Sequence, residues 1–134
     1  MWEVTLPLKI RQSKSKWFHL NLNNYRNAHY QTLNKVKVNF TEEVLPLLKG
    51  IPPMERCYLR YVLYLPTARK TDVANVGSVV DKFFSDALVK SGALPDDNYD
   101  HLPMVVYEFA GIDRKNPRAV VEIHQIGEID ETCN

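Results

Sequence analysis

Apolar and polar side chains alternate along several segments of the chain, and such alternation is typical of half-buried β-strands. The first segment covers residues 2–10, where Pro7 indicates an edge strand or a bulge because proline has no backbone N–H to donate. The second covers residues 57–65. Segments 103–110 and 118–126 are predicted to form a β-hairpin, because the turn-rich sequence GIDRKNPR joins them.

Two other segments place their apolar residues at helical spacing. The first is residues 28–48, where Pro46 is expected to bend the helix or to confine its last turn. In the second helix, which Gly92 ends, the apolar stripe consists of Val76, Val79, Val80, Phe83, Phe84, Ala87 and Leu88. Residues 11–27 are rich in Lys, Ser and Asn and are interpreted as a loop.

The resulting order is β-α-β-α-β-β, which predicts an α+β fold with two layers, in which two helices cover a mixed sheet. The 134 residues are enough for one domain, spanning 1–134, and too few for two. Residues 127–134, with the sequence GEIDETCN, are expected to form a mobile acidic tail.

The start of the second helix is open between two positions. Ser78 and Asp81 have the spacing of a capping box, which would begin the helix at Ser78 and leave the preceding residues as a loop. Such a loop could fold Asp72 towards Asp97. A helix that ran straight from residue 73 would keep Asp72 out of reach, because the chain after the helix is too short to return that far.

The charge distribution says more than the net charge, which is only +1. Residues 9–37 contain seven basic residues and no acidic residue. A segment of this kind indicates a surface that meets phosphates. The alternative is a solvated basic face without a partner.

Several classes of function are disfavoured by the composition. No apolar run approaches the roughly 18 residues needed to cross a bilayer, so no membrane partner is expected. The chain has five glycines and lacks a Gly-rich phosphate loop, which argues against a nucleotide cofactor. The four histidines show no metal-ligand spacing. Cys57 and Cys133 show no disulfide signature, which favours a reduced, cytoplasmic setting.

Five aspartates and Lys82 lie on and around the second helix, between Asp72 and Asp97. Carboxylates gathered in one concavity repel one another, and a divalent cation such as Mg²⁺ or Mn²⁺ removes that repulsion. The alternative is plain surface acidity. Asp72 itself is either a ligand or a turn residue that follows a basic loop.

The other members of this group also have two interpretations. Asp81 is either a metal ligand or a first-turn residue that favours the helix dipole. Only one of the adjacent Asp96 and Asp97 is expected to point into a site, and Asp97 is favoured. Asp86 is interpreted as structural. Lys82 is either a solvated helix lysine or a group that stabilises a developing phosphate anion.

At these residues the chain resembles the RusA-type Holliday junction resolvases of bacteriophages and prophages. The likeness covers nearly the whole domain, and it includes the N-terminal run NLNNYRNAHYQTLNKVK. The family has a helix with a lysine, a few apolar residues, Asp-Ala-Leu, a glycine and a paired Asp-Asp. The corresponding residues here are Lys82, Asp86-Ala87-Leu88, Gly92 and Asp96-Asp97.

The chain departs from the family pattern at one position. Better-known members carry Asp-x-Asp-Asn before the lysine, whereas this sequence reads Asp72-Val73-Ala74-Asn75. One expected carboxylate is therefore missing. Either the carbonyl oxygen of Asn75 or the carboxylate of Asp81 could replace it, and the lost charge should weaken metal affinity.

The resemblance implies a homodimeric endonuclease that depends on Mg²⁺ or Mn²⁺ and resolves four-way DNA junctions in the cytoplasm of a bacterial host. Asp72 and Asp97 are then expected to bind metal, Asn75 or Asp81 to complete the shell, and Lys82 to stabilise the transition state. The residues expected to hold DNA phosphates are Lys14, Lys16, Arg26, Lys35, Lys37, Arg69 and Lys70.

Two alternative functions remain open from the sequence. The missing aspartate is compatible with a junction-binding protein that has weakened or lost catalysis. A broader nuclease that cuts flaps or forks in branched DNA has the same requirements for metal and phosphate binding. Comparison of four-way, flap and fork substrates separates these alternatives.

Overall fold

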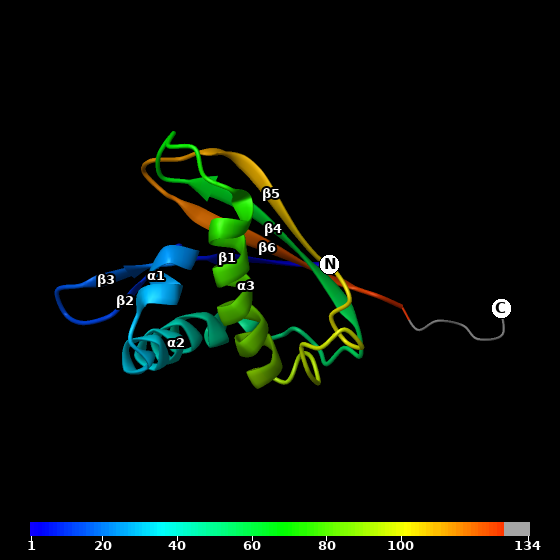
Figure 1. The fold of residues 1–134 in the computed structure, drawn as a ribbon. Coiled ribbons are helices and arrows are strands. Elements are labelled where there is room, and N and C mark those ends of the chain that lie inside the picture. The colour runs from blue at the N-terminus through cyan, green and yellow to red at the C-terminus, as the bar shows by residue number, and fades with distance from the viewer. Residues whose placement is uncertain (128–134) are drawn as a thin grey trace.

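The computed structural model describes residues 1–127 of the chain. It contains a four-stranded sheet, a two-stranded hairpin, three α-helices and one 3₁₀ helix (Figure 1). In chain order these are β1 (Trp2–Leu6), β2 (Lys9–Arg11), β3 (Trp17–His19), α1 (Leu22–Asn27), α2 (Tyr30–Val44), η1 (Leu45–Leu48), β4 (Cys57–Leu65), α3 (Val73–Lys90), β5 (Val105–Ile112) and β6 (Arg118–Gln125). The expected acidic tail falls largely on residues 128–134, which lie outside the described residues.

The main sheet has the strand order β1-β6-β4-β5. Strand β4 pairs antiparallel with β6 and parallel with β5, while β1 pairs antiparallel with β6. The predicted mixed sheet and the α+β class are therefore confirmed. Strand β1 lies at an edge and ends just before Pro7, as expected for a residue that cannot donate to a strand ladder.

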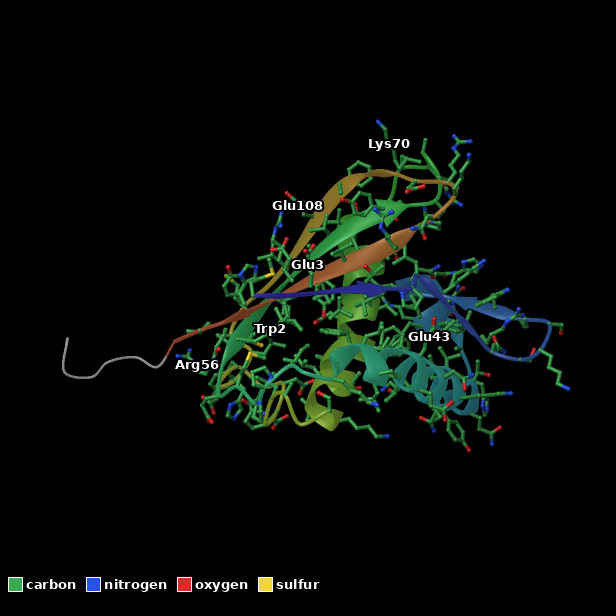
Figure 2. All side chains as sticks on the ribbon, turned by 180° about the vertical axis from the view of Figure 1, so that it is seen from behind. Trp2, Glu3, Glu43, Arg56, Lys70 and Glu108 are labelled. Carbon is green, nitrogen blue, oxygen red and sulfur yellow. The ribbon has the colours of Figure 1, made fainter. Side chains whose placement is uncertain are left out.

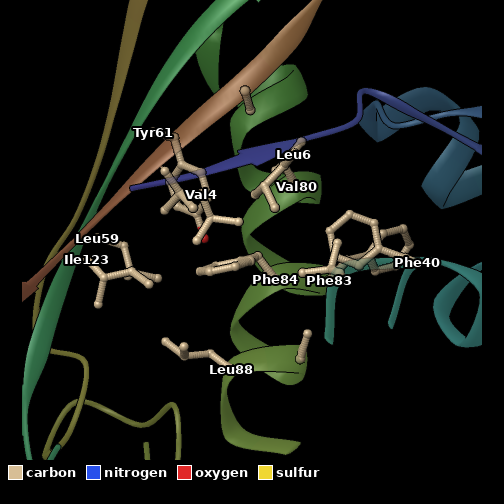
Figure 3. Packing of buried hydrophobic residues seen from close by; sticks show 14 of the residues in the cluster. Val4, Leu6, Phe40, Leu59, Tyr61, Val80, Phe83, Phe84, Leu88 and Ile123 are labelled. Carbon is tan, nitrogen blue, oxygen red and sulfur yellow. The ribbon is translucent and has the colours of Figure 1, made fainter. Parts of the chain in front are cut away.

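Helix α3 packs across one face of this sheet and supplies much of the core (Figure 3). Phe84 and Leu88 are buried against the inward-facing side chains of β4, such as Leu59 and Tyr61, whereas Phe83 is buried on the side that faces α2. Helix α2 packs beside α3 rather than on the central strands, and its Phe40 ring lies 5.6 Å from that of Phe83. The two-layer arrangement follows from the apolar stripe of α3 and the alternation of β4.

The opposite face of the sheet carries polar and charged side chains (Figure 2). Arg60 on β4 pairs there with Glu108 on β5 and with Glu122 on β6, whose carboxylate lies 2.5 Å from the guanidinium. These cross-strand ion pairs fix neighbouring strands in register without forming a second core. The core is therefore confined to the helical side.

The predicted hairpin between segments 103–110 and 118–126 is wrong, although both strands exist. Strand β4 lies between β5 and β6 and pairs with both of them. The residues that join β5 to β6 cross over the end of β4, a span of about 10 Å that five residues cover easily. Alternation identified the strands, but it carries no information on which strand is the neighbour.

The prediction of a loop over residues 11–27 is also wrong, because the segment folds into most of a short hairpin and a helix. Ile10 on β2 and Phe18 on β3 face each other across the hairpin and are both buried. Asn21 then caps α1, with its side-chain oxygen 2.8 Å from the N–H of Asn24. Few apolar residues anchor this segment, so its composition resembled that of a loop.

The first predicted helix, residues 28–48, is divided into α2 and the 3₁₀ helix η1. Pro46 lies within η1, and its missing N–H accounts for the change from α to 3₁₀ geometry. The expectation that Pro46 would confine the last turn is confirmed.

The second predicted helix begins at Val73, so of the two starts left open by the sequence the earlier one is confirmed and the capping-box start at Ser78 is wrong. Gly77 serves helix packing instead of a turn: a Cβ atom there would lie 2.7 Å from the ring of Tyr107 on β5. Ser78 lies within the helix and donates a hydrogen bond of 2.5 Å to the carbonyl of Ala74. This early start determines the position of every carboxylate on α3.

Within the described part of the chain, none of the helices combines the length and the apolar character that a membrane-spanning helix requires.

Candidate active site

A pocket of about 380 Å³ lies beside the middle of α3, where α1, α2 and the chain after α3 approach it. We call it the carboxylate pocket. It is lined by Tyr25, Lys37, Asp81, Lys82, Ser85, Asp86, Asp97, Leu102 and Val105. Three carboxylates and two lysines therefore share one concavity.

Asp81 is the least solvated of these carboxylates. The phenol of Tyr61, fully buried on β4, donates a hydrogen bond of 2.8 Å to Asp81 Oδ1. Burial raises the pKa of Tyr61 well above its usual value, so the phenol stays protonated and remains a donor. The Tyr61 hydroxyl fixes the orientation of the Asp81 carboxylate.

Burial is also the main cause that raises the pKa of Asp81. The nearby charges of Asp97 and Asp86 add to this rise, while the Tyr61 hydrogen bond and Lys82 oppose it. The charged form of Asp81 is thus held in a costly environment, which a bound cation would improve.

Asp97 enters the pocket from the turn after α3, and the preceding residue explains why. The carboxylate of Asp96 accepts hydrogen bonds from the backbone N–H of Asp97 at 2.7 Å and from Asn98 Nδ2 at 3.1 Å. The Asp96 carboxylate therefore stabilises the turn through these two hydrogen bonds, as aspartates in turns often do. Asp97, and not Asp96, lines the pocket.

The two lysines of the pocket differ in their partners. Lys37 Nζ lies 3.7 Å from Asp86 Oδ2, so these two side chains partly neutralise each other. Lys82 is exposed, and its Nζ lies 5.7 Å from the ring centroid of Tyr25 on α1. A cation–π contact holds Lys82 in place without removing its charge.

Asp72 and Asn75, the other two expected metal ligands, lie at the N-terminal end of α3 and do not line the carboxylate pocket. Asp81 comes nine positions after Asp72, which corresponds to about 14 Å along the helix axis at 1.5 Å per residue. Asn75 is already used: its Oδ1 accepts from the N–H of Leu22 at 3.3 Å, and its Nδ2 donates to Thr71 at 3.0 Å. The four expected ligands thus fall into two groups.

The remaining pair, Asp81 and Asp97, fits one common mode of metal binding. Among residues 1–127, no group of three or more His, Cys, Asp or Glu side chains is placed so that it could hold a metal ion. Mg²⁺ is, however, usually bound through one or two carboxylates and completes its shell with waters and substrate phosphates. Two hard carboxylates at an open pocket, one of them half-buried and oriented by a hydrogen bond, suit that mode.

The seven basic residues expected to contact DNA are spread over several surface regions rather than one patch. They are Lys37 in the carboxylate pocket; Arg26, Arg69 and Lys70 in pockets at the N-terminal end of α3; Lys16 in a pocket beside α1; Lys14 in the turn between β2 and β3; and Lys35 on the exposed side of α2. Lys37, Arg26, Arg69 and Lys70 line pockets to which α1 also contributes residues, so these four lie near α1.

Two residues of the site were not predicted from the sequence. Tyr61 was assigned only to the buried face of its strand, although a buried phenol requires a hydrogen-bond partner and its inward position was a usable signal. Asp86 was interpreted as structural, and its salt bridge with Lys37 agrees with that role even though Asp86 lines the pocket.

The raised pKa of Asp81 has a consequence for stability. A carboxyl whose pKa is higher in the folded state stabilises the fold while it is protonated, and this contribution is lost as the pH rises through that pKa. Without metal at pH 7, Asp81→Asn should therefore raise the Tm, because Asn keeps an acceptor for Tyr61 and carries no charge. The gain should vanish below about pH 3, under the ordinary Asp pKa.

Thermal unfolding at several pH values measures this effect. Asp86→Asn is the control: its side chain is 56% exposed, so the removed charge was solvated and no comparable gain is expected. A lower Tm for Asp81→Asn at pH 7 would show that the buried charge is not destabilising.

Comparison with known proteins gave no match, either to a family model or to a curated protein.

Proposed function

We propose that this chain is a metal-dependent endonuclease that acts on branched DNA, with four-way junctions as its substrate and a symmetric dimer as its active form. The observation that carries the proposal is the convergence of Asp81, Asp97 and Lys82 in one open pocket. The sequence resemblance supplies the substrate class and the dimer. The pocket supplies the chemistry that such a reaction requires.

The roles of the side chains follow from their surroundings. Asp81 and Asp97 would hold a Mg²⁺ or Mn²⁺ ion, which when bound neutralises phosphate charge and activates water for phosphodiester hydrolysis. Tyr61 positions the Asp81 carboxylate through its hydrogen bond. Lys82 keeps its charge beside the pocket and would stabilise the negative charge that develops on the phosphate.

This assignment changes the ligand set that the sequence alone suggested. Asp81 takes the place of Asp72 as the partner of Asp97, because the helix begins at Val73 and keeps Asp72 at its far end. Asn75 is engaged with Leu22 and Thr71 and is assigned to the packing of α1 against α3.

The surroundings of the pocket favour a polyanionic substrate. Lys37 lies in the pocket, and α1 contributes Tyr25 to it and Arg26 to the next pocket, which Lys70 also lines. A strand whose scissile phosphate sat at Asp81 could therefore meet further cations on either side. Such contacts give affinity without reading sequence.

A junction-binding protein with weakened catalysis is the second candidate function. The observation that favours it is that two carboxylates in the pocket remain for metal once Asp86 is paired with Lys37. This candidate predicts structure-selective binding without nicking at any metal concentration.

The deciding experiment is a cleavage assay on a synthetic four-way junction, with Mg²⁺ and Mn²⁺ titrated separately. Flap, fork and linear duplex substrates are compared at equal salt. Paired nicks in opposite strands of the junction support the proposal, and preferred cutting of flaps or forks would replace junctions as the substrate. Binding without any product at all metal concentrations would favour the non-catalytic candidate.

A further inference from the structure

A second cavity lies away from the carboxylate pocket and shares no lining residue with it. It is a groove of about 640 Å³ between the β2–β3 hairpin, the end of α2 and the turns that follow β4 and β5. We call it the hairpin groove. Its lining includes Lys9, Trp17, Glu43, Arg114, Lys115 and Arg118.

The hairpin groove is strongly basic. Four Lys and Arg side chains line it, and Glu43 is its one carboxylate. Lys9, Arg114 and Lys115 are exposed, and none of them is in an ion pair within the described part of the chain. Their charges are therefore available to a ligand.

One cation on each wall of the groove, Lys9 and Arg118, has a partner that positions its side chain. On the hairpin, Lys9 Nζ and the guanidinium of Arg11 lie 4.7 Å and 4.0 Å from the ring of Trp17, which is 40% exposed. On the other wall, Arg118 donates 3.0 Å hydrogen bonds to Asp113 and to the carbonyl of Asn116. The Trp17 ring positions the hairpin cations without neutralising them. The hydrogen bonds of Arg118 stabilise the turn that carries Arg114 and Lys115.

This pattern distinguishes the ligand. A buried anion site would pair its cations with one small ion, whereas these side chains are exposed and come from two separate elements that line an open groove. Exposed cations outside any described ion pair, present on both sides of the groove, suit a ligand with repeated negative charges.

We propose that the hairpin groove binds the phosphate backbone of a second DNA strand, through Lys9 on the hairpin and through Arg114 and Lys115 on the β5–β6 turn, with Arg11 next to this lining through its contact with the Trp17 ring. This inference rests on the proposed function, since a branched substrate offers a second arm to a surface outside the active site. Trp17 holds the hairpin cations and lies next to the strand. Glu43 lies in the same groove and opposes binding, because its carboxylate repels phosphates.

The test measures binding without metal, so that cleavage plays no part. The variant Arg114→Ala/Lys115→Ala should bind a four-way junction at least about tenfold more weakly, because two charged contacts are lost. The slope of log affinity against log salt should fall by about 2. The control Lys49→Ala/Lys90→Ala loses the same charge at exposed positions outside both pockets and should leave the slope unchanged.

A second variant and a probe protect the test against misfolding. Glu43→Gln should tighten binding by about 1.5-fold to fivefold, a gain that a damaged fold would not produce. In a Trp2→Phe background the emission of Trp17 should change as DNA binds, and saturate together with the binding curve.

Several outcomes would overturn the inference. Equal salt slopes for the Arg114/Lys115 and the Lys49/Lys90 variants would show that DNA does not contact the groove. Unchanged Trp17 emission with DNA bound would show the same. Tighter binding of an acidic peptide of matched charge would identify the groove as a protein-binding surface. If the Arg114/Lys115 variant binds and cuts the junction like the wild type, the proposed DNA binding by the groove is contradicted, while the proposed nuclease function stands. If the wild type binds no DNA, both fail.

Discussion

Replacing Asp97 by Asn should reduce junction cleavage at least about 100-fold while binding of the junction is retained. The substitution keeps the size of the side chain and removes the charge that would hold a divalent cation beside Asp81. Loss of one group that stabilises a transition state commonly costs a factor of this order or more. Single-turnover cleavage of an end-labelled junction measures the rate, and anisotropy without metal measures binding.

The structure offers a closely matched control in the adjacent residue. Asp96→Asn makes the same chemical change in the same turn, but the Asp96 carboxylate is bonded to the N–H of Asp97 and to Asn98. An Asn oxygen can accept the same backbone N–H, so the turn should persist and cleavage should continue near the wild-type rate. Equal losses in both variants would point to the turn itself, and wild-type cleavage by Asp97→Asn would remove the carboxylate pocket from the reaction.

The strand and helix patterns were readable because burial imposes them locally. The β4 strand was predicted with the bounds it has, Cys57–Leu65, since its buried and half-buried residues alternate without interruption. The stripe on α3 was predicted equally well, because six of its seven residues are buried and Val76 packs against them. In both elements the burial of each residue follows from its own position along the strand or helix, so the sequence pattern alone predicts it.

Strand pairing and the start of α3 depend on contacts between distant residues, and there the sequence was insufficient. Strands β5 and β6 have a turn between them, yet β4 separates them. Gly77 directly precedes the possible capping box at Ser78, where glycine would suit a turn, whereas in the fold it allows close contact with Tyr107, thirty positions later in the sequence. Glycine permits both uses, and only the packing partner distinguishes them.

The same dependence governed the candidate site. Asp81, Lys82 and Asp97 were among the residues named from the sequence and line one pocket, but which carboxylates lie together depends on where α3 begins. Had α3 begun at Ser78, Asp81 would lie in its first turn and Asp72 could have folded back. With α3 beginning at Val73, Asp81 lies mid-helix, where Tyr61 reaches it from the sheet. The start of α3 therefore decides which aspartate is half-buried against the sheet.

Because the sheet and α3 together position Asp81, the core beneath them should be sensitive to truncation. Phe84 is fully buried on α3, and its ring meets that of Tyr61 edge-on, with centroids 6.2 Å apart at 89°. Phe84→Ala should lower the free energy of unfolding by about 3–5 kcal/mol, because it removes an aromatic ring and leaves a cavity. That is a large part of the roughly 5–15 kcal/mol that stabilises a typical domain.

Urea unfolding followed by circular dichroism measures this loss, and Phe109→Ala is the matched control. Phe109 on β5 is 51% exposed, so the same truncation there should cost much less, and the midpoint should shift little. Because Tyr61 loses the ring that packs against it, Phe84→Ala should also weaken metal binding beyond the loss expected from unfolding alone. Equal destabilisation by the two variants would mean that α3 does not form the core of the sheet, and the buried position of Asp81 would lose its physical basis.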